Sequence, residues 1–342
     1  MRILLIGGNG FIGVPLTREL LEGGHEISIL HRGHADSRKN LRHIEGDRND
    51  LPSCRAAIQA FSPDVIVDLI LSSGKQAREA MDLARGTTPR LVALSSQDVY
   101  RAWGVLKGTE PGELEPLPIT EGSSLRSTSR LYPPEAIRGL QGVFSWVNED
   151  YDKIAVEQAV MTRPEVAGTV LRLPMIYGPG DRLHRFFPIW KRIADGRRSI
   201  LLADDFAAWR GPRGYVDNVA HAIALATINE TAAGRIYNVC EEPCACEVEW
   251  QKRIASETGW AGEFVVLPAS RTPQHLRFDG NPRQHIVVSS EKIRKELGYT
   301  ELIDIDEAIR RTISWEEACS PAKVDLEPFD YAAEDQALAG TA

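Results

Sequence analysis

The chain of 342 residues has few cysteines, no long apolar run and no excess of positive charge. Five irregularly spaced cysteines do not make a disulfide framework, so we expect a cytoplasmic protein. Cys240, Cys244 and Cys246 lack a paired C-x-x-C spacing, and no metal site is predicted. No apolar run reaches the ~20 residues that span a bilayer, so we expect no membrane contact. A formal net charge of −8 argues against nucleic-acid binding through bulk charge.

What the chain does contain is a glycine-rich turn, Gly-Gly-Asn-Gly-Phe-Ile-Gly, at residues 7–13. An apolar run at 3–6 precedes the turn, and a helical apolar pattern follows it, which predicts a strand, a turn and a helix. Gly7 would allow the tight turn, Gly10 would let a pyrophosphate approach the backbone, and Gly13 would let the helix pack closely. The N–H groups at the helix N-terminus would face the phosphates. The turn therefore predicts dinucleotide binding.

Short apolar strands alternate with helical patterns through the first half of the chain. This alternation predicts an α/β fold, a Rossmann-type doubly wound parallel sheet with a smaller C-terminal substrate-binding lobe. Ligands of such sheets bind at the carboxyl ends of the strands. The later predicted strands cover 27–30, 41–45, 65–69, 91–94 and 166–172, and the predicted helices cover 53–61, 75–85 and 148–161.

Three segments follow from this pattern. Residues 1–175 form an NAD(P)-binding Rossmann domain with a long insertion at about 101–147, where the alternation fails and Pro, Gly and Glu are frequent. We interpret the insertion as a lid or an interface, because structureless loops of that length are unusual in compact domains. Residues 176–320 form a mixed substrate-binding lobe interleaved with the Rossmann core, and residues 321–342 form a loosely ordered polar tail.

Several ordered blocks resemble one known family. Ser95-Ser-Gln-Asp-Val-Tyr100 is similar to a family S-S-x-x-V-Y segment, Lys153-Ile-Ala-Val-Glu157 to K-x-x-x-E, and residues 171–181 to a turn that ends in Y-G-P-G-D. Together they resemble the extended short-chain dehydrogenase/reductase superfamily, specifically NAD(P)-dependent epimerases and dehydratases. The resemblance implies an oxidoreductase that works at a hydroxyl or keto carbon, with reduction, epimerisation or dehydration as the outcome.

The end of the second strand informs the choice of cofactor. NAD-using relatives place an acidic residue there, whereas this chain has Arg32, which could bind the 2′-phosphate of NADP. We therefore predict NADP(H), with NAD as the alternative. The resemblance places Asp47 at the adenine amino group, and Arg48 could stack on the adenine or add charge for phosphate. Phe11, Ile12 and Pro174 complete the predicted cofactor site, together with the three glycines and Lys153.

The catalytic residues depart from the family pattern. The family uses a serine, a tyrosine and a lysine, with the tyrosine four residues before the lysine. Ser96 and Lys153 match, but Glu149 occupies the tyrosine position, and Tyr151 lies only two residues before Lys153. Tyr151 could act if the helix begins late, and Asp150 could then be its N-cap. Glu149 could act instead as a carboxylate tuned by burial. Otherwise another residue, such as Tyr132 in the insertion, acts, or classical redox chemistry is lost.

We predict a small anionic or sugar-like substrate because cations are frequent beyond the sixth strand. Arg182, Arg210 and Arg213 are the predicted substrate residues, with Tyr132 from the insertion. We expect a small-molecule substrate and no nucleic acid, and a homodimer is the assembly considered. The alternative from another class is a non-catalytic NAD(P)-binding sensor or RNA-associated protein that has lost the usual tyrosine.

Overall fold

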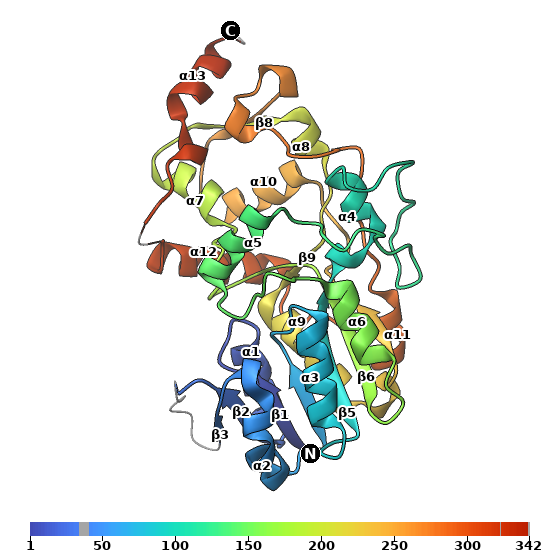
Figure 1. Ribbon diagram of the computed structural model, residues 1–342. Coiled ribbons are helices and arrows are strands. Elements are labelled where there is room, and N and C mark those ends of the chain that lie inside the picture. The colour runs from blue at the N-terminus through green and yellow to red at the C-terminus, as the bar shows by residue number, and fades with distance from the viewer. Residues whose placement is uncertain (34–40, 322, 341–342) are drawn as a thin grey trace.

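A seven-stranded parallel sheet forms the lower half of the molecule in Figure 1, a computed structural model that describes residues 1–33, 41–321 and 323–340. The strand order is β10-β6-β5-β4-β1-β2-β3, so the chain starts in the middle of the sheet and builds both sides. The predicted doubly wound fold is confirmed. The strands are β1 (Arg2–Ile6), β2 (Glu26–His31), β3 (Leu41–Glu45), β4 (Val65–Asp68), β5 (Arg90–Ser96), β6 (Ala167–Leu173) and β10 (Ile236–Asn238).

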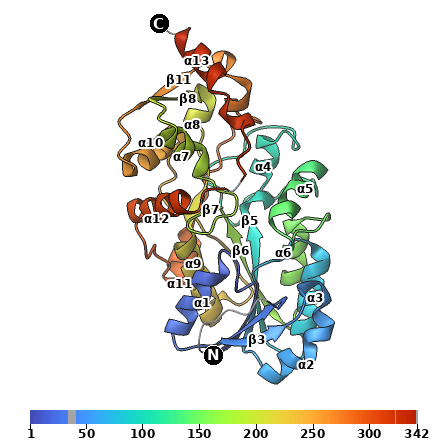
Figure 2. The ribbon, with the colours of Figure 1, turned by 90° about the vertical axis from the view of Figure 1, so that its left-hand side faces the viewer.

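Helices cover both faces of this sheet (Figure 2). The central strands are apolar on both sides, as in β1, where residues 3–6 are fully buried. One face packs against α1 (Gly13–Glu22), α9 (Val216–Ile228) and α11 (Glu291–Leu297). The other face packs against α2 (Leu51–Phe61), α3 (Gly74–Ala84) and α6 (Lys153–Met161).

A second lobe lies above the carboxyl ends of the strands (Figure 1). Its own apolar core gathers Tyr177, Phe186, Tyr215 and Trp250. Two small parallel sheets belong to it, β7 with β9 and β8 with β11. Its elements are β7 (Met175–Tyr177), α7 (Phe187–Ala194), β8 (Ser199–Ala203), α8 (Asp204–Ala208), β9 (Arg213–Tyr215), α10 (Glu247–Glu257), β11 (Glu263–Leu267) and α12 (Ile305–Ala318).

The insertion and the C-terminal segment are more ordered than their composition predicted. The insertion holds two helices, α4 (Arg101–Leu106) and α5 (Pro134–Val143). The expected loose tail forms α13 (Tyr331–Ala339), whose fully buried Glu334 lies 2.7 Å from the guanidinium of Arg192. No helix among the described residues is long and apolar enough to cross a membrane. Short 3-10 turns lie at Arg48–Asp50, Gln97–Val99, Glu230–Ala232, Ala269–Arg271, Gln274–Leu276 and Glu327–Phe329.

The helix expected at 148–161 begins later than predicted. It starts at Lys153, and the side chain of Asp152, not that of Asp150, accepts the capping hydrogen bond. The preceding segment is held against Ser72, whose carbonyl accepts the N–H of Asp152 at 2.9 Å. The Ser72 hydroxyl accepts the N–H of Asn148 at 3.1 Å. These tertiary contacts hold the segment outside the helix, so the prediction of an Asp150 cap is wrong.

Candidate functional site

A cavity of about 490 Å³ lies at the carboxyl end of β1. It is large enough for a ligand, and it sits where ligands of open α/β sheets bind. Residues from the glycine turn, β2 and the end of β3 line it, and so does the chain just before β7. The predicted cofactor residues in its lining are Gly7, Gly10, Phe11, Ile12, Gly13, Arg32, Asp47, Arg48 and Pro174.

The backbone geometry of the turn requires glycine. Gly7 has a φ of +89°, in the left-handed region. A Cβ on Gly13 would lie 2.4 Å from the carbonyl oxygen of Gly7, so only glycine fits there. A Cβ on Gly10 would meet the same oxygen at 3.2 Å and would stand in the cavity. This arrangement fits a pyrophosphate close to the backbone.

Arg32 and the end of the insertion meet across this cavity. The Arg32 guanidinium donates a 2.7 Å hydrogen bond to Oγ of Ser145. Phe144 and Trp146 flank that serine and line the same cavity. The end of the insertion therefore lines this cavity, which we call the cofactor cavity because it gathers predicted cofactor residues.

Arg48 lines the cavity and is held by buried neighbours. Its side chain is only 4% exposed, and its Nη2 lies 3.1 Å from Oδ2 of Asp68. The same nitrogen donates to the carbonyl of Gln76 at 2.7 Å. Burial raises the pKa of the Asp68 carboxyl, and the Arg48 charge opposes that rise. The Arg48 guanidinium thus pairs with a buried acid, and its contact with adenine or phosphate stays a prediction. Asp47 caps the next turn, because its side chain accepts the N–H of Asn49 at 2.9 Å.

Two tyrosines converge on one buried carboxylate after β5. The Tyr151 hydroxyl donates to Oδ2 of Asp98 at 2.9 Å, and the Tyr132 hydroxyl donates to the same oxygen at 3.3 Å. The two rings meet edge to face with centroids 5.9 Å apart. The Ser96 hydroxyl accepts the N–H of Asp98 at 3.2 Å. Because Tyr151 precedes α6, its direction is set by the loop rather than by a helix face.

Burial and charge govern the protonation of this cluster. Burial raises the pKa of Tyr151 well above its usual range, and the Asp98 carboxyl adds to the effect. Burial also raises the pKa of Asp98, against the opposing charge of Arg126, whose Nη2 lies 4.0 Å away. Tyr151 is therefore a neutral hydroxyl at physiological pH.

Lys153 links the tyrosine to the cofactor cavity. Its Nζ donates to the carbonyl of Leu71 and, at 3.1 Å, to the carbonyl of Leu94. Nζ lies 5.8 Å from the ring of Tyr151 and 5.8 Å from the ring of Trp146, a cavity residue. Burial lowers the pKa of Lys153 to about 8, and Asp98 is the strongest opposing charge. An ammonium has three donors, so one remains for a further acceptor.

Glu149 does not join this cluster. It is exposed, on the loop before α6. The hypothesis of a carboxylate tuned by burial is therefore wrong for Glu149. The buried carboxylate of the site is Asp98, which sequence reasoning did not select. Its signal was its position two residues after Ser96, at the carboxyl end of a buried strand.

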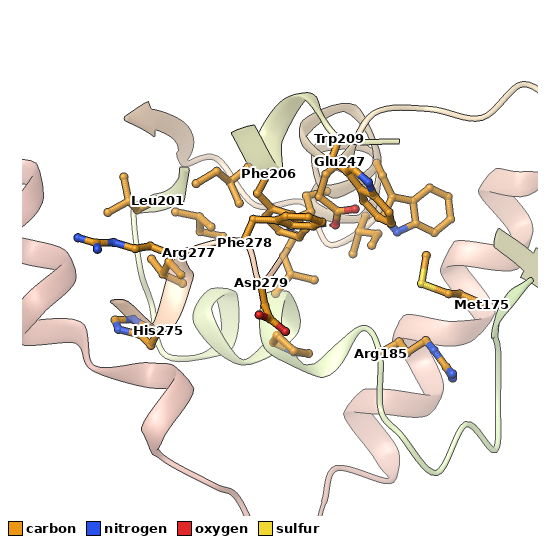
Figure 3. Close-up of a pocket in the computed structure, with 18 of the residues that line it drawn as sticks. Met175, Arg185, Leu201, Phe206, Trp209, Glu247, His275, Arg277, Phe278 and Asp279 are labelled. Atoms are coloured by element: carbon orange, nitrogen blue, oxygen red, sulfur yellow. Dashed lines mark hydrogen bonds between the residues drawn. The ribbon is translucent and has the colours of Figure 1, made fainter. Parts of the chain in front are cut away.

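A second cavity of about 440 Å³ lies in the upper lobe (Figure 3). Strand β7 separates the two cavities. Pro174 and Ile176 line the cofactor cavity, and Met175 between them lines the second one, as expected from the alternation of a strand. Arg185 lines both. The second cavity therefore lies next to the cofactor cavity across β7.

The three predicted substrate arginines do not converge on this second cavity. Arg182 lines the cofactor cavity instead. Arg210 is exposed, and Arg213 forms an ion pair with Glu247 and stacks over Trp250 at 4.7 Å. The three arginines thus lie in different surroundings, and their contact with a substrate stays a prediction.

Comparison with known proteins decides the family. The sequence model of the NAD dependent epimerase/dehydratase family matches residues 3–88 and 126–240. The chain belongs to this family. The expected resemblance is confirmed, and the unmatched residues 89–125 contain β5, Asp98 and α4.

Individual relatives of this epimerase/dehydratase chain are distant. UDP-glucose 4-epimerase of Corynebacterium glutamicum is 24% identical and covers 88% of this chain and 91% of its own. The chloroplast stem-loop binding protein of 41 kDa b of Arabidopsis thaliana is 23% identical, over 90% of this chain and 77% of its own. The solved dTDP-glucose 4,6-dehydratase of Bacillus anthracis, in complex with NAD, has a TM-score of 0.66 at 17% identity and covers 93% and 97%. This last likeness shows the fold.

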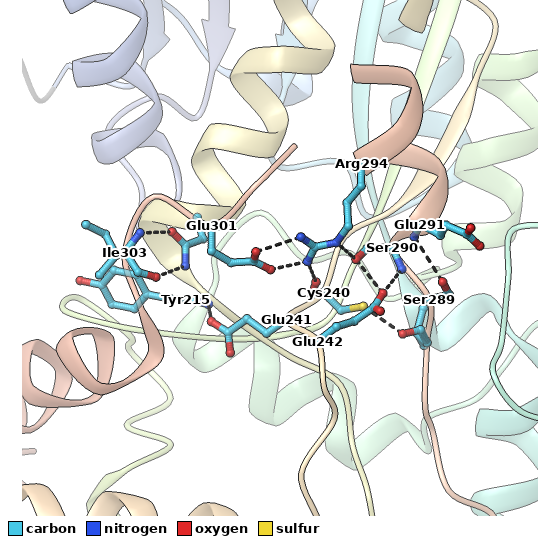
Figure 4. Close-up of polar contacts among 12 residues, drawn as sticks. Tyr215, Cys240, Glu241, Glu242, Ser289, Ser290, Glu291, Arg294, Glu301 and Ile303 are labelled. Carbon is cyan, nitrogen blue, oxygen red and sulfur yellow. Dashed lines mark hydrogen bonds and ion pairs between the residues drawn. The ribbon is translucent and has the colours of Figure 1, made fainter. Parts of the chain in front are cut away.

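A polar network braces the junction of sheet and lobe in this epimerase/dehydratase chain (Figure 4). Glu241 follows β10 and accepts the N–H of Tyr215 at 2.8 Å and the hydroxyl of Tyr177 at 3.0 Å. In the same network, the guanidinium of Arg294 forms an ion pair with Glu301. Burial raises the pKa of Glu241 to about 7, although its two hydrogen bonds act in the opposite direction. The Glu241 carboxyl thus joins β7 and β9 of the lobe to the chain that follows β10 of the sheet.

Proposed function

We propose that this family member is an NADP(H)-dependent oxidoreductase that transfers hydride at a hydroxyl or keto carbon of a small molecule. The observation that carries the proposal is the convergence of the Tyr151 hydroxyl, Ser96, Asp98 and Lys153 beside the cofactor cavity. Groups able to move a proton thus lie next to a site shaped for a dinucleotide.

The residues support carbonyl reduction most directly. The bound dinucleotide would supply the hydride to the carbonyl carbon. The neutral Tyr151 hydroxyl would donate its proton to the carbonyl oxygen, which becomes the product hydroxyl. Ser96 would hold that oxygen, and the third donor of Lys153 would bind a ribose hydroxyl. Asp98 accepts the Tyr151 proton in a hydrogen bond, so the hydroxyl would turn from Asp98 to the substrate oxygen during the reaction.

Arg32 supports the choice of NADP(H). It lies at the end of β2, lines the cavity and carries no acidic neighbour in its strand segment Ile27–His31. A 2′-phosphate could replace the Ser145 hydroxyl as the acceptor of its N–H groups. NAD remains the alternative, as in the complex of the Bacillus anthracis dehydratase.

The non-catalytic alternative has one observation in its favour, the relative named for stem-loop binding. The reductase and epimerase names of other relatives, such as 2'-dehydrokanamycin reductase of Streptomyces kanamyceticus, favour an enzyme. The Tyr151 cluster favours an enzyme as well, since a protein that only binds RNA has no need of a proton donor beside its cofactor cavity.

Tyr151→Phe tests the proposal. It removes one oxygen and little packing, so NADPH oxidation with a panel of aldehydes and ketones should fall by about 10²-fold or more while NADPH affinity in calorimetry stays unchanged. Glu149→Gln is the matched control, because that side chain is exposed on the same loop, and it should be nearly silent. Wild-type turnover in Tyr151→Phe would contradict the proposal.

A further inference from the structure

We propose that the second cavity takes a flat, uncharged aromatic ketone, aldehyde or alcohol rather than a nucleotide-linked sugar. This inference rests on the proposed function, because it names the substrate class of that same reaction. It replaces the anionic or sugar-like substrate that the sequence predicts.

Aromatic rings form the walls of the cavity. Phe278 lies at its centre in Figure 3, stacked on Phe206 with ring centroids 5.6 Å apart and tilted against Trp209 at 5.4 Å. Trp103 from α4 and Trp250 from α10 complete the aromatic lining. Aliphatic side chains from β8 fill the space between them. Such walls bind a flat ring through stacking and the exclusion of water.

The charged side chains of the lining are matched by other groups of the protein. Glu247 is paired with Arg213, and it also accepts Nε2 of Gln251 at 3.1 Å. Lys107 is paired with Asp279 at 3.1 Å. Binding a diphosphate through Arg213 would require it to leave Glu247, which carries a cost because that pair is largely buried.

The remaining cations of the lining are also engaged. Arg192 lies 2.7 Å from the fully buried Glu334, and Nε2 of His275 lies 3.2 Å from that same carboxylate. Arg185 lies 2.8 Å from Asp181. Arg277 is exposed and donates to a backbone carbonyl, and in Figure 3 its side chain extends away from Phe278. Among the lining cations, only Arg277 has no carboxylate within ion-pair distance in the part of the chain that the structure describes, so the cavity offers rings more than positive charge.

The position of the cavity suits a substrate of the proposed reaction. Met175 faces it from β7, between two residues that face the cofactor cavity. Trp103 lies on α4, five residues after Asp98. A ring held against Met175 would lie next to the cofactor cavity, because Pro174 and Ile176 on either side of Met175 line that cavity.

Binding of two probes tests the inference without any turnover. With NADPH bound, 2-naphthol should bind and quench the tryptophan fluorescence, and calorimetry should find UDP at least ~tenfold weaker. Phe278→Leu and Phe278→Ala should each weaken 2-naphthol binding. Phe264→Leu is the matched control, because that ring packs on Trp260 outside the cavity and should leave binding unchanged.

Glu247→Gln tests the charge argument directly. It releases Arg213 from its ion pair, so affinity for UDP should rise while affinity for 2-naphthol changes little. Tighter binding of UDP than of 2-naphthol by the wild-type protein would overturn the inference, as would equal losses in the Phe278 and Phe264 variants. Tyr151→Phe should bind 2-naphthol normally, so failure of the proposed chemistry is distinguishable from failure of this site.

Discussion

Glu241 makes the stability of this protein depend on pH in the direction opposite to that of most carboxylates. Its pKa rises from an ordinary value of 4.5 to about 7, first because the side chain is desolvated. The folded state then holds the proton more tightly than the unfolded chain does. The contribution is fully present below about pH 4.5 and is lost as the pH rises through about 7.

The size of the effect follows from that interval. A difference between 4.5 and about 7 corresponds to ~3 kcal/mol at ~1.4 kcal/mol for each pH unit. The side chain is partly exposed, so we expect ~1–3 kcal/mol after hydration is taken into account. Glu241→Gln keeps an oxygen acceptor for the Tyr215 N–H but carries no charge. The variant should therefore be more stable than the wild type by that amount at alkaline pH and nearly equal to it in acid.

Urea unfolding at about pH 5 and about pH 8.5 measures the difference, because titrations shared by both proteins cancel. Glu149→Gln is the control, since its exposed carboxyl should give the same small change at both values. A Glu241→Gln effect of equal size at both pH values would refute the reasoning, and so would a variant that is less stable at alkaline pH.

Three further predictions concern the cofactor. Gly10→Val should abolish NADPH binding in calorimetry and leave the circular dichroism spectrum unchanged, because the new side chain would stand in the cavity. Normal affinity for NADPH would show that the glycine turn does not bind the cofactor. Arg32→Ala should weaken NADP by ~1.5–3 kcal/mol and NAD far less, and a wild type that prefers NAD would contradict this. Lys153→Met should lower both cofactor affinity and turnover, since one ammonium serves two carbonyls and a ribose; normal turnover in that variant would show that its role was misread.

Much of the fold could be predicted from local patterns. The glycine turn depends largely on neighbouring residues, because Gly7 is demanded by its own positive φ and Gly13 by contacts with residues 7 and 8. The strand and helix alternation likewise reflects a periodicity that a sequence displays directly. The same holds for the position of the cofactor cavity at the carboxyl end of β1, which follows from the topology.

The catalytic and substrate sites depended on tertiary structure. The start of α6 at Lys153 is set by Ser72, a residue far away in the chain. Tyr132 and Tyr151 meet at Asp98 across 34 and 53 residues, and Arg213 is neutralised by Glu247 across 34 residues. Such pairings leave no periodic trace in a sequence, because they are set by how separate elements pack. The sequence by itself therefore determined the sheet and the dinucleotide turn, while packing decided which acid faces Tyr151 and which cations remain free for a substrate.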